Sequence, residues 1–479
     1  MNDEKKYIAI DLGAESGRVM LGIVSADNLR LHEIHRFLNG PIEQNGSLHW
    51  DFGHIISEVK TGIGKAVKEA GQGVAGIGID SWGVDFGLLD KKGKLIENPY
   101  HYRDKRTNGI MEKAFERMPK REIYEQTGIQ FMQFNSVYQL FAMQANDSPV
   151  LKKAGKMLFI ADLVSYFLTG KPYCEYTLAS TSQMMDMRSG QWAKAIFEKL
   201  NLPFGIMPEC VLPGTEAGKL SKIVREETGS AAIPVFAVAS HDSANAVAAV
   251  PADKNTTWAY ISSGTWSVIG IENPKAIIND KTFTNNFTNE GGIDGTIRLL
   301  TNIMGLWLIQ ECKRQWKKEG TDYSYAQLAE LAQKARLHIA SINTSSYEFL
   351  APGNMPQRIN EHLKRNGYAA ISDKGQIVRV ILESLASKYY EIIKQLEEVA
   401  GKQIDCIHIV GGGSQNELLN QFTADATGKT VLAGPAEATA IGNIVTLARA
   451  SGQIKNLWDA RRLIAKSFSV KEYRPGKNF

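Results

Sequence analysis

The chain has 479 residues, more than one hydrophobic core usually supports, and its 43% hydrophobic and 22% charged content is that of a globular protein, so two domains are expected. Its 55 basic and 51 acidic residues are intermixed and leave a net charge of +4, which gives no footprint for nucleic acid. The four cysteines stand far apart without C-x-x-C spacing, which argues against a zinc site or a disulfide framework.

The N-terminal segment alternates as strands do. It carries charge and no apolar run before Asp11, so no signal peptide is expected. No stretch of the chain reaches the roughly 18 apolar residues of a spanning helix, and we expect a cytoplasmic protein without a membrane partner. Apolar periodicity predicts four strands and one amphipathic helix, which cover 7–11, 18–24, 29–37 and 74–80 for the strands and 51–68 for the helix. A hairpin is predicted over 86–96, turning at Lys92-Gly93.

The second half begins after a turn-rich stretch. Residues 250–257 combine Pro, Asp, Lys and Asn, which predicts a boundary between an N-terminal domain, 1–250, and a C-terminal domain, 251–479. Residues 258–271 repeat the strand, small-residue turn and strand of the N-terminus, which favours two lobes built on one plan. A long helix is predicted over 376–400, with Gly401 as its C-cap. Strands alternate with helices throughout, so the fold class is α/β.

Three glycine-containing turns follow strands, at residues 12–17, 263–267 and 411–415. Such turns bring backbone N–H groups close to phosphate oxygens, although tight turns also need glycine for backbone reasons alone. Two familiar phosphate motifs fail. Thr423 stands where a P-loop requires its first glycine, and Asn416 where G-x-G-x-x-G requires its third. Any phosphate bound here therefore needs another architecture.

The order of several motifs resembles the FGGY family of sugar kinases, within the actin/hexokinase/Hsp70-like superfamily. The resemblance covers nearly the whole chain and is carried by "DLGAESGR", "GIGIDSWGVDFGLLD", "SHDSANAV", "ISSGTWS" and "IHIVGGGSQN". It implies two actin/hexokinase-like (ribonuclease H-like) lobes that flank a catalytic cleft, with the sugar on the N-terminal lobe and ATP mainly on the C-terminal lobe.

Other stretches are most similar to the family members that act on L-rhamnulose. These are "EIHRFLNG", "YRDKRTNG" and "NIMGLWLIQ". The activity that this resemblance implies is transfer of a phosphoryl group from ATP to the 1-hydroxyl of L-rhamnulose, giving L-rhamnulose 1-phosphate and ADP in L-rhamnose catabolism.

Asp242 lies among small and apolar residues and matches the family's proton acceptor. A carboxylate within reach of a sugar hydroxyl can orient it and take its proton as the phosphoryl group arrives. The residues alone favour Asp242 as the N-cap of a helix that begins near Ala244, and the motif match favours it as the base.

The other site residues are carried over from the same resemblance. The predicted substrate contacts are Gly83, His241, Asp242, Ser243 and Asn302. The predicted nucleotide contacts are Ala14, Glu15, Ser16, Gly17, Arg18, Thr265, Gln310 and Gly412. Glu15 departs from the small residue expected there, so only its backbone would be useful. Asp11 is interpreted either as a turn former or as an acid that holds Mg²⁺ directly or through water.

Two alternatives to this activity are open. One is a kinase of the same family for another ketose, such as L-fuculose or L-xylulose, because a few hydrogen bonds in the cleft decide which sugar is accepted. The other is a nucleotide-driven switch of the actin or chaperone type, without a small substrate. The sequence does not distinguish a monomer from a small homo-oligomer.

Overall fold

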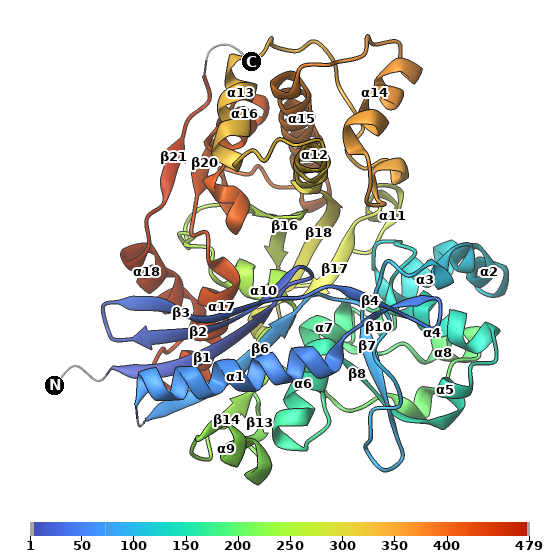
Figure 1. The fold of residues 1–479 in the computed structure, drawn as a ribbon, viewed down its shortest axis with the longest axis vertical. Coiled ribbons are helices and arrows are strands. Elements are labelled where there is room, and N and C mark those ends of the chain that lie inside the picture. Colours follow the sequence, from blue (N-terminus) through green and yellow to red (C-terminus); the bar gives the residue numbers. More distant parts are fainter. Residues whose placement is uncertain (1–3, 72, 477–479) are drawn as a thin grey trace. The chain divides into compact units, whose positions relative to one another are not determined.

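The computed structural model describes residues 4–71 and 73–476. The chain divides into two compact units (Figure 1). Unit 1 comprises Met1–Pro251, Glu272–Leu299 and Ala438–Ser467, and unit 2 comprises Ala252–Ile271, Leu300–Glu437 and Phe468–Phe479. Two late segments therefore pack with the N-terminal residues, and the division at residue 250 stays a prediction about domains.

Unit 1 is built on a six-stranded sheet with the order β13-β14-β6-β1-β2-β3. Its strands are β1 (Lys5–Leu12), β2 (Ser16–Val24), β3 (Leu29–Leu38), β6 (Val74–Ser81), β13 (Glu216–Lys219) and β14 (Pro234–Phe236). The four strands predicted in the N-terminal region are confirmed as β1, β2, β3 and β6. Because β6 is parallel to both β1 and β14, the carboxyl ends of these three strands meet at one edge of the sheet.

Helices cover both faces of this sheet. The predicted helix is confirmed as α1 (Phe52–Ala70), whose Gly62 lies against Val19 of β2. Ile444 of α17 (Ala438–Ala450) lies against Gly22, three residues further along β2. Side chains alternate along a strand, so α1 and α17 lie on opposite faces. Figure 1 shows α1 in front of this sheet, with its axis close to the direction of β1 and β6.

The remaining elements of unit 1 lie outside its six-stranded sheet, and one of them, β17, pairs with β18 (Ile297–Met304) in the second sheet. The helices are α2 (Ile110–Arg117), α3 (Lys120–Thr127), α4 (Ser136–Ala145), α5 (Pro149–Lys153), α6 (Ile160–Thr169), α7 (Tyr176–Ser180), α8 (Lys194–Leu200), α9 (Lys222–Thr228), α10 (Asp242–Ala248), α11 (Asp280–Thr284) and α18 (Leu457–Ser467). The strands are β4 (Pro41–Gln44), β5 (Ser47–Trp50), β7 (Phe86–Asp90), β8 (Ala154–Phe159), β9 (Cys174–Glu175), β10 (Met185–Asp186), β11 (Gln191–Trp192), β12 (Cys210–Val211) and β17 (Thr288–Gly291).

The predicted hairpin over 86–96 is only partly present. The turn forms, with Gly93 at a φ of 81°, but the returning segment contributes a single bridge between Leu89 and Leu95. The main partner of β7 is β8, which pairs with it along its length. β7 therefore has two neighbours, the returning segment at Leu95 and the distant strand β8, and the longer pairing is with β8.

Unit 2 contains a second sheet built from strands of the C-terminal half. β15 (Trp258–Ser263) pairs antiparallel with β16 (Trp266–Asn273) and parallel with β19 (Cys406–Val410). β20 (Thr430–Ala433) and β21 (Lys471–Tyr473) extend the sheet beyond β19. The helices of unit 2 are α12 (Trp307–Lys318), α13 (Tyr325–Lys334), α14 (Met355–Arg365), α15 (Lys374–Ala400) and α16 (Glu417–Thr427). β18 (Ile297–Met304) begins in unit 1 and ends in unit 2.

The long predicted helix is confirmed as α15, and Gly401 ends it in the left-handed conformation, with a φ of 64°. The α/β class with two sheet-containing units is likewise as predicted. In the part of the chain that the structure describes, no helix has both the length and the apolar character needed to cross a bilayer.

Candidate active site

The carboxyl edge of the unit 1 sheet gathers several of the predicted residues. Asp11 on β1 and Asp80 on β6 are direct neighbours in the parallel register. Ser81, the last residue of β6, bridges to His241, and its N–H donates to the carbonyl of Ser240 at 2.8 Å. Strand pairing therefore places Asp11 and the segment leading to Asp242 at the same edge, where α/β folds commonly bind ligands.

Asp242 is the first residue of α10, and His241 occupies the N-cap position. The prediction that Asp242 caps a helix starting near Ala244 is therefore wrong. The extended backbone continues through His241, whose N–H donates to the hydroxyl of Thr177 at 3.1 Å, and the helix begins immediately afterwards. The Asp242 carboxylate accepts a hydrogen bond from the adjacent N–H of Ser243 at 2.5 Å.

The environment of Asp242 suits a base. Nε2 of His241 lies 3.5 Å from Oδ1 of Asp242, and the Asp242 side chain keeps 35% of its surface exposed. Partial removal from water by the surrounding protein raises the pKa of this carboxyl above its usual range, and the negative charge of Asp11 raises the pKa further. A raised pKa brings a carboxylate closer to the operating pH, which improves general-base catalysis.

Gly83 lies beside His241 in a strained loop. A methyl group added at Gly83 would lie 3.3 Å from Nε2 of His241 and 3.1 Å from Oγ1 of Thr181. The next residue, Val84, has a φ of 68°, which is unfavourable for a β-branched side chain. Its N–H donates to Thr181 and its carbonyl accepts from Ser136 Oγ at 2.6 Å, so the surroundings hold the strained conformation. Strain maintained in this way is typical of functional loops.

Behind this loop, Asp85 joins it to the core. Its carboxylate accepts hydrogen bonds from Nε1 of Trp50 at 2.7 Å, Nε1 of Trp82 at 3.0 Å and Nε2 of Gln139 at 2.8 Å. Burial nevertheless raises the pKa of Asp85 to about 6. Trp82 is 7% exposed, so it supports the loop from within the core.

The first glycine turn connects β1 to β2. The N–H of Gly13 donates to the carbonyl of Ser16 at 2.9 Å, which closes the turn. The carbonyl of Glu15 accepts from the N–H of Asn39 at 3.0 Å, while the Glu15 side chain is exposed. The turn therefore lies at the same sheet edge as Asp11, at the end of the strand that Asp11 belongs to.

Arg18 pairs with Asp11 across the β1–β2 register. Its Nη2 donates to Oδ2 of Asp11 at 2.5 Å, and both side chains are largely buried. Arg18 is therefore held at this edge of the sheet by its ion pair with Asp11. Within residues 4–71 and 73–476, no three His, Cys, Asp or Glu side chains form a group able to hold a metal ion by themselves. Mg²⁺ in phosphate-transfer sites usually takes one or two carboxylates, substrate phosphates and water, and the Asp11 carboxylate at this edge fits that requirement.

Asp80 is completely buried, and no motif in the sequence predicted a role for it. Its Oδ2 accepts from Nδ2 of Asn443 at 2.6 Å and from Nδ2 of Asn245 at 3.1 Å. Its Oδ1 has no hydrogen-bond partner among the described residues. Burial, with the charges of Asp11 and Asp242 adding to it, raises the pKa of Asp80 well above its usual range. Asp80 thereby links β6 to α17 and to the helix that carries Asp242.

We expect Asp80→Asn to make the stability of the protein less dependent on pH. A carboxyl whose pKa is raised by folding stabilises the protein fully only below its unfolded pKa of about 3.9, and this contribution is lost as the pH rises through the raised folded pKa. Asparagine stays neutral, and its carbonyl can still accept the two amide hydrogen bonds. In urea unfolding between about pH 5 and about pH 8, the stability of the variant relative to the wild type should therefore increase with pH. A difference that stays constant would contradict a buried, proton-binding Asp80.

The second glycine turn belongs to unit 2 and is attached to the start of α12. The carbonyl of Thr265 accepts from the N–H groups of Gly305 at 3.0 Å and Trp307 at 3.2 Å. Gln310 follows one turn later on α12, and its Oε1 is buried without a hydrogen-bond partner in the described chain. A buried acceptor of this kind is suited to a ligand donor.

The third turn, after β19, packs on the end of β15. Gly413 lies against Ser263, whose Oγ is buried without a partner among the residues described. No atom lies within 4 Å of the position that a Cβ of Gly412 would take, so this residue faces open space. The turn that contains Gly412 therefore lies beside Ser263, at the start of the turn that contains Thr265. Asn302 on β18 belongs to the same unit.

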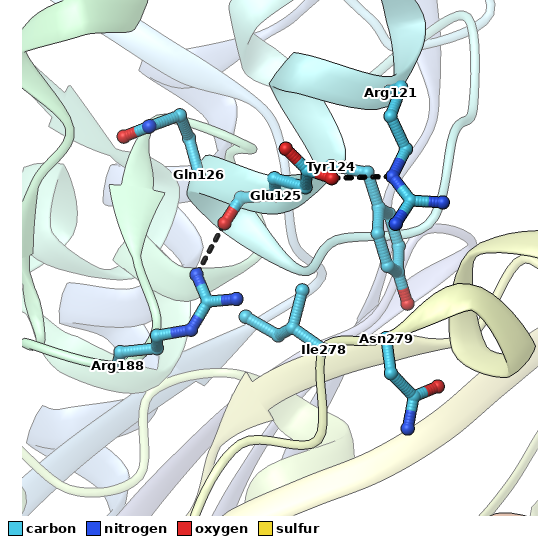
Figure 2. Close-up of a pocket in the computed structure, with 7 residues that line it drawn as sticks. All are labelled: Arg121, Tyr124, Glu125, Gln126, Arg188, Ile278 and Asn279. Atoms are coloured by element: carbon cyan, nitrogen blue, oxygen red, sulfur yellow. Dashed lines mark hydrogen bonds and ion pairs between the residues drawn. The ribbon is translucent and has the colours of Figure 1, made fainter.

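A pocket of about 350 Å³ in unit 1 is separate from these residues (Figure 2). Its lining residues are Arg121, Tyr124, Glu125, Gln126, Arg188, Ile278 and Asn279. Both guanidinium groups are bonded to Glu125, that of Arg121 to its carboxylate and that of Arg188 to its carbonyl. None of the predicted site residues lines this pocket.

Family models decide the relationship of the chain to known proteins. Residues 6–248 match the N-terminal domain of the FGGY family of carbohydrate kinases, and residues 259–451 match the C-terminal domain. The chain is an FGGY carbohydrate kinase. The family resemblance that the motifs predicted is thus confirmed over most of the sequence.

This FGGY kinase is similar to several curated proteins over nearly its full length. A rhamnulokinase of Bacteroides thetaiotaomicron is 43% identical over 473 residues, covering 98% of this chain and 96% of the relative. A rhamnulokinase of Bacillus subtilis is 41% identical over 469 residues, covering 98% and 95%.

Solved structures share the fold of this kinase at low sequence identity. The xylulose kinase of Lactobacillus acidophilus is 16% identical with a TM-score of 0.79, covering 98% of this chain and 94% of that one. The glycerol kinase of Plasmodium falciparum, solved with ADP, is 16% identical with a TM-score of 0.77 and the same coverage. At this level of identity the likeness establishes the α/β fold with its two sheet-containing units.

Proposed function

We propose that this FGGY kinase transfers the γ-phosphoryl group of ATP to the 1-hydroxyl of L-rhamnulose, giving L-rhamnulose 1-phosphate and ADP. The observation that carries the proposal is its similarity to rhamnulokinases of several bacteria, at 38–43% identity over nearly the whole chain. L-Fuculose or L-xylulose as the substrate, and a nucleotide-driven switch, receive no comparable support from these relatives.

In this proposal Asp242 is the proton acceptor. Its carboxylate, partly exposed and with a raised pKa, would orient the 1-hydroxyl and take its proton as the bond to phosphorus forms. His241 and Ser243 flank it and, with Gly83 and Asn302, would contact the hydroxyl groups of the ketose. The close approach of Gly83 to Nε2 of His241 supports the grouping of these two residues.

In this proposal glycine turns contact the phosphates of the nucleotide. Backbone N–H groups of Ala14, Glu15, Ser16 and Gly17, with the Arg18 guanidinium, would face the phosphates from unit 1, as glycine turns after strands commonly do. Thr265, Gln310 and Gly412 are the other proposed nucleotide contacts. Asp11 would hold Mg²⁺ directly or through water. When bound, the ion neutralises charge on the phosphates during transfer.

A panel of ketoses tests the substrate. With ATP and Mg²⁺ in a coupled ADP-release assay, we expect the highest kcat/KM for L-rhamnulose and lower values for L-fuculose and L-xylulose, because loss of a single hydrogen bond to a buried polar group discriminates strongly. Chelation of the metal should reduce turnover to background, and phosphorus NMR should locate the product phosphate on C1.

Each other outcome of this panel supports a different conclusion. A higher kcat/KM for another ketose would replace L-rhamnulose as the substrate while leaving the kinase reaction in place. Slow ATP turnover that no sugar changes would favour the switch. Full activity without a divalent ion would remove the proposed role of Asp11.

A further inference from the structure

Arg298 is a buried arginine that the mechanism above does not use. It lies near the start of β18, and its side chain has no exposed surface. Nε donates to the carbonyl of Gly291 at 2.9 Å, and Nη2 donates to Oε2 of Glu290 at 3.0 Å. Glu290 on β17 is also buried, so the two charges compensate each other away from water.

The remaining contacts of this guanidinium reach the two residues that flank Asp242. Nη1 donates to Oγ of Ser243 at 2.9 Å, and Nη2 lies 3.2 Å from Nδ1 of His241. Arginine is always protonated and has no acceptor atom. Contact with Arg298 therefore requires Nδ1 of His241 to be the acceptor, which leaves the imidazole proton on Nε2.

The Nε2 side of this imidazole faces the proposed sugar site. It lies 3.5 Å from Oδ1 of Asp242 and beside Gly83. Oγ of Ser243, 3.1 Å from Nδ1 of His241, can donate its hydroxyl proton there in this tautomer. Oε2 of Glu290, 3.3 Å from Nδ1, would accept a proton from it and so opposes this tautomer. Because the same oxygen accepts from Arg298, the guanidinium competes for it and favours the Nε2–H form.

We propose that Arg298, held by Glu290, is a positioning residue of the active site that keeps His241 in the Nε2–H tautomer and the Ser243 hydroxyl in place, so that both present hydrogen-bonding groups to the ketose beside Asp242. This inference rests on the proposed function, which assigns His241 and Ser243 to the sugar. It predicts an effect on the use of the sugar and little effect on the use of ATP.

The tautomer can be measured without any substrate. Protein labelled with ¹⁵N-histidine contains nine histidines, and the His241→Asn variant identifies the signal of His241. We expect the wild type to show a neutral ring with the proton on Nε2. In Arg298→Met, the signal should change toward a ring protonated on Nδ1, because Glu290 remains as the acceptor. A wild-type ring already protonated on Nδ1 would overturn the inference, whichever sugar the enzyme uses.

Kinetics test the consequence with a double variant that leaves no unpaired buried charge. In Arg298→Met/Glu290→Leu, kcat/KM for L-rhamnulose should fall about 100-fold, the loss expected when a group in the active site is displaced by about 1 Å. The KM for ATP should be retained. Arg298→Lys should lie between the wild type and the double variant, since lysine supplies the charge without the two-pronged geometry.

The chain offers a matched control in Arg461 and Glu272. This pair is also in unit 1 and is joined at 2.8 Å, and Arg461 is almost completely buried. Arg461 donates to Glu272 and to the carbonyl of Val247, and its guanidinium lies over the ring of Trp458. Arg461→Met/Glu272→Leu should retain both the tautomer of His241 and kcat/KM. An equal loss in both double variants would reduce Arg298 to a structural role and contradict the proposal.

Discussion

Asp242→Asn is expected to lower sugar-dependent ATP turnover by about 10²–10⁴-fold, the usual contribution of a general base. The carboxamide has nearly the shape of the carboxylate, and its oxygen can still accept from the N–H of Ser243. It is neutral, however, and cannot take the proton of the attacking hydroxyl. The measurement is kcat with L-rhamnulose, together with calorimetric titration of ATP, whose affinity should be retained.

The pH profile separates loss of a base from loss of structure. In the wild type, kcat/KM should fall as the pH decreases through the raised pKa of Asp242, because the protonated carboxyl is no longer a base. The residual rate of Asp242→Asn should lack this acidic limb. Near-normal turnover in the variant, or an unchanged acidic limb, would rule out the assigned role.

Asp147→Asn is the control, because it makes the same chemical change at an exposed position outside the proposed site. The Asp147 side chain is 82% exposed, and its φ of 52° is tolerated by aspartate and asparagine alike. Turnover and its pH profile should match those of the wild type.

The elements that the sequence predicted well are those whose signal is local. The strands β1 and β2 were visible from their alternation, and α15 from its apolar periodicity and the glycine at residue 401. The hairpin at 86–96 was predicted from an equally local signal, but the longer pairing of β7 is with β8, which no local signal identifies. Local patterns identify elements, and tertiary packing selects their partners.

The same distinction applies to the candidate site. Asp242 and its neighbours stand together in one motif, so they were found from the sequence. The residues that support them were not, because Asp80 is bonded to a side chain 363 residues away and Arg298 to one 55 residues away. A lone buried acid or arginine carries no sequence pattern that distinguishes it from a surface charge until its partners are located in space.

The second large effect is expected for Gly442→Ala, because Gly442 packs against α10, the helix that carries Asp242. Gly442 of α17 faces α10, and a Cβ placed on it would lie 1.9 Å from the carbonyl oxygen of Asn245 and 2.5 Å from its carbonyl carbon. These are backbone atoms, so no side-chain rotation can relieve the clash, and α10 must move away. Asn245 is three residues from Asp242 and donates to Asp80, so this movement disturbs both the base and its support.

Two opposing effects decide the size of the change. Alanine is more favourable than glycine inside a helix by about 1 kcal/mol, whereas overpacking a core costs about 1–3 kcal/mol and occasionally more. Since the contact is far shorter than any real Cβ contact, the upper end applies, and we expect a net loss of about 2 kcal/mol in the free energy of unfolding. A displacement of Asp242 of the order of 1 Å should in addition lower kcat/KM about 100-fold.

Gly53→Ala is the matched control, because Gly53 also lies in a helix of unit 1, in the first turn of α1, and is exposed. The nearest atom to its added methyl group is Oδ1 of Asp51, at 3.5 Å, an ordinary contact. Calorimetric unfolding should show Gly53→Ala equal to or more stable than the wild type by less than about 1 kcal/mol, with unchanged kcat/KM. If Gly442→Ala behaved in the same way, the close approach of α10 to α17 would not be what holds Asp242 in position, because the helices would have accommodated a methyl group without moving the base.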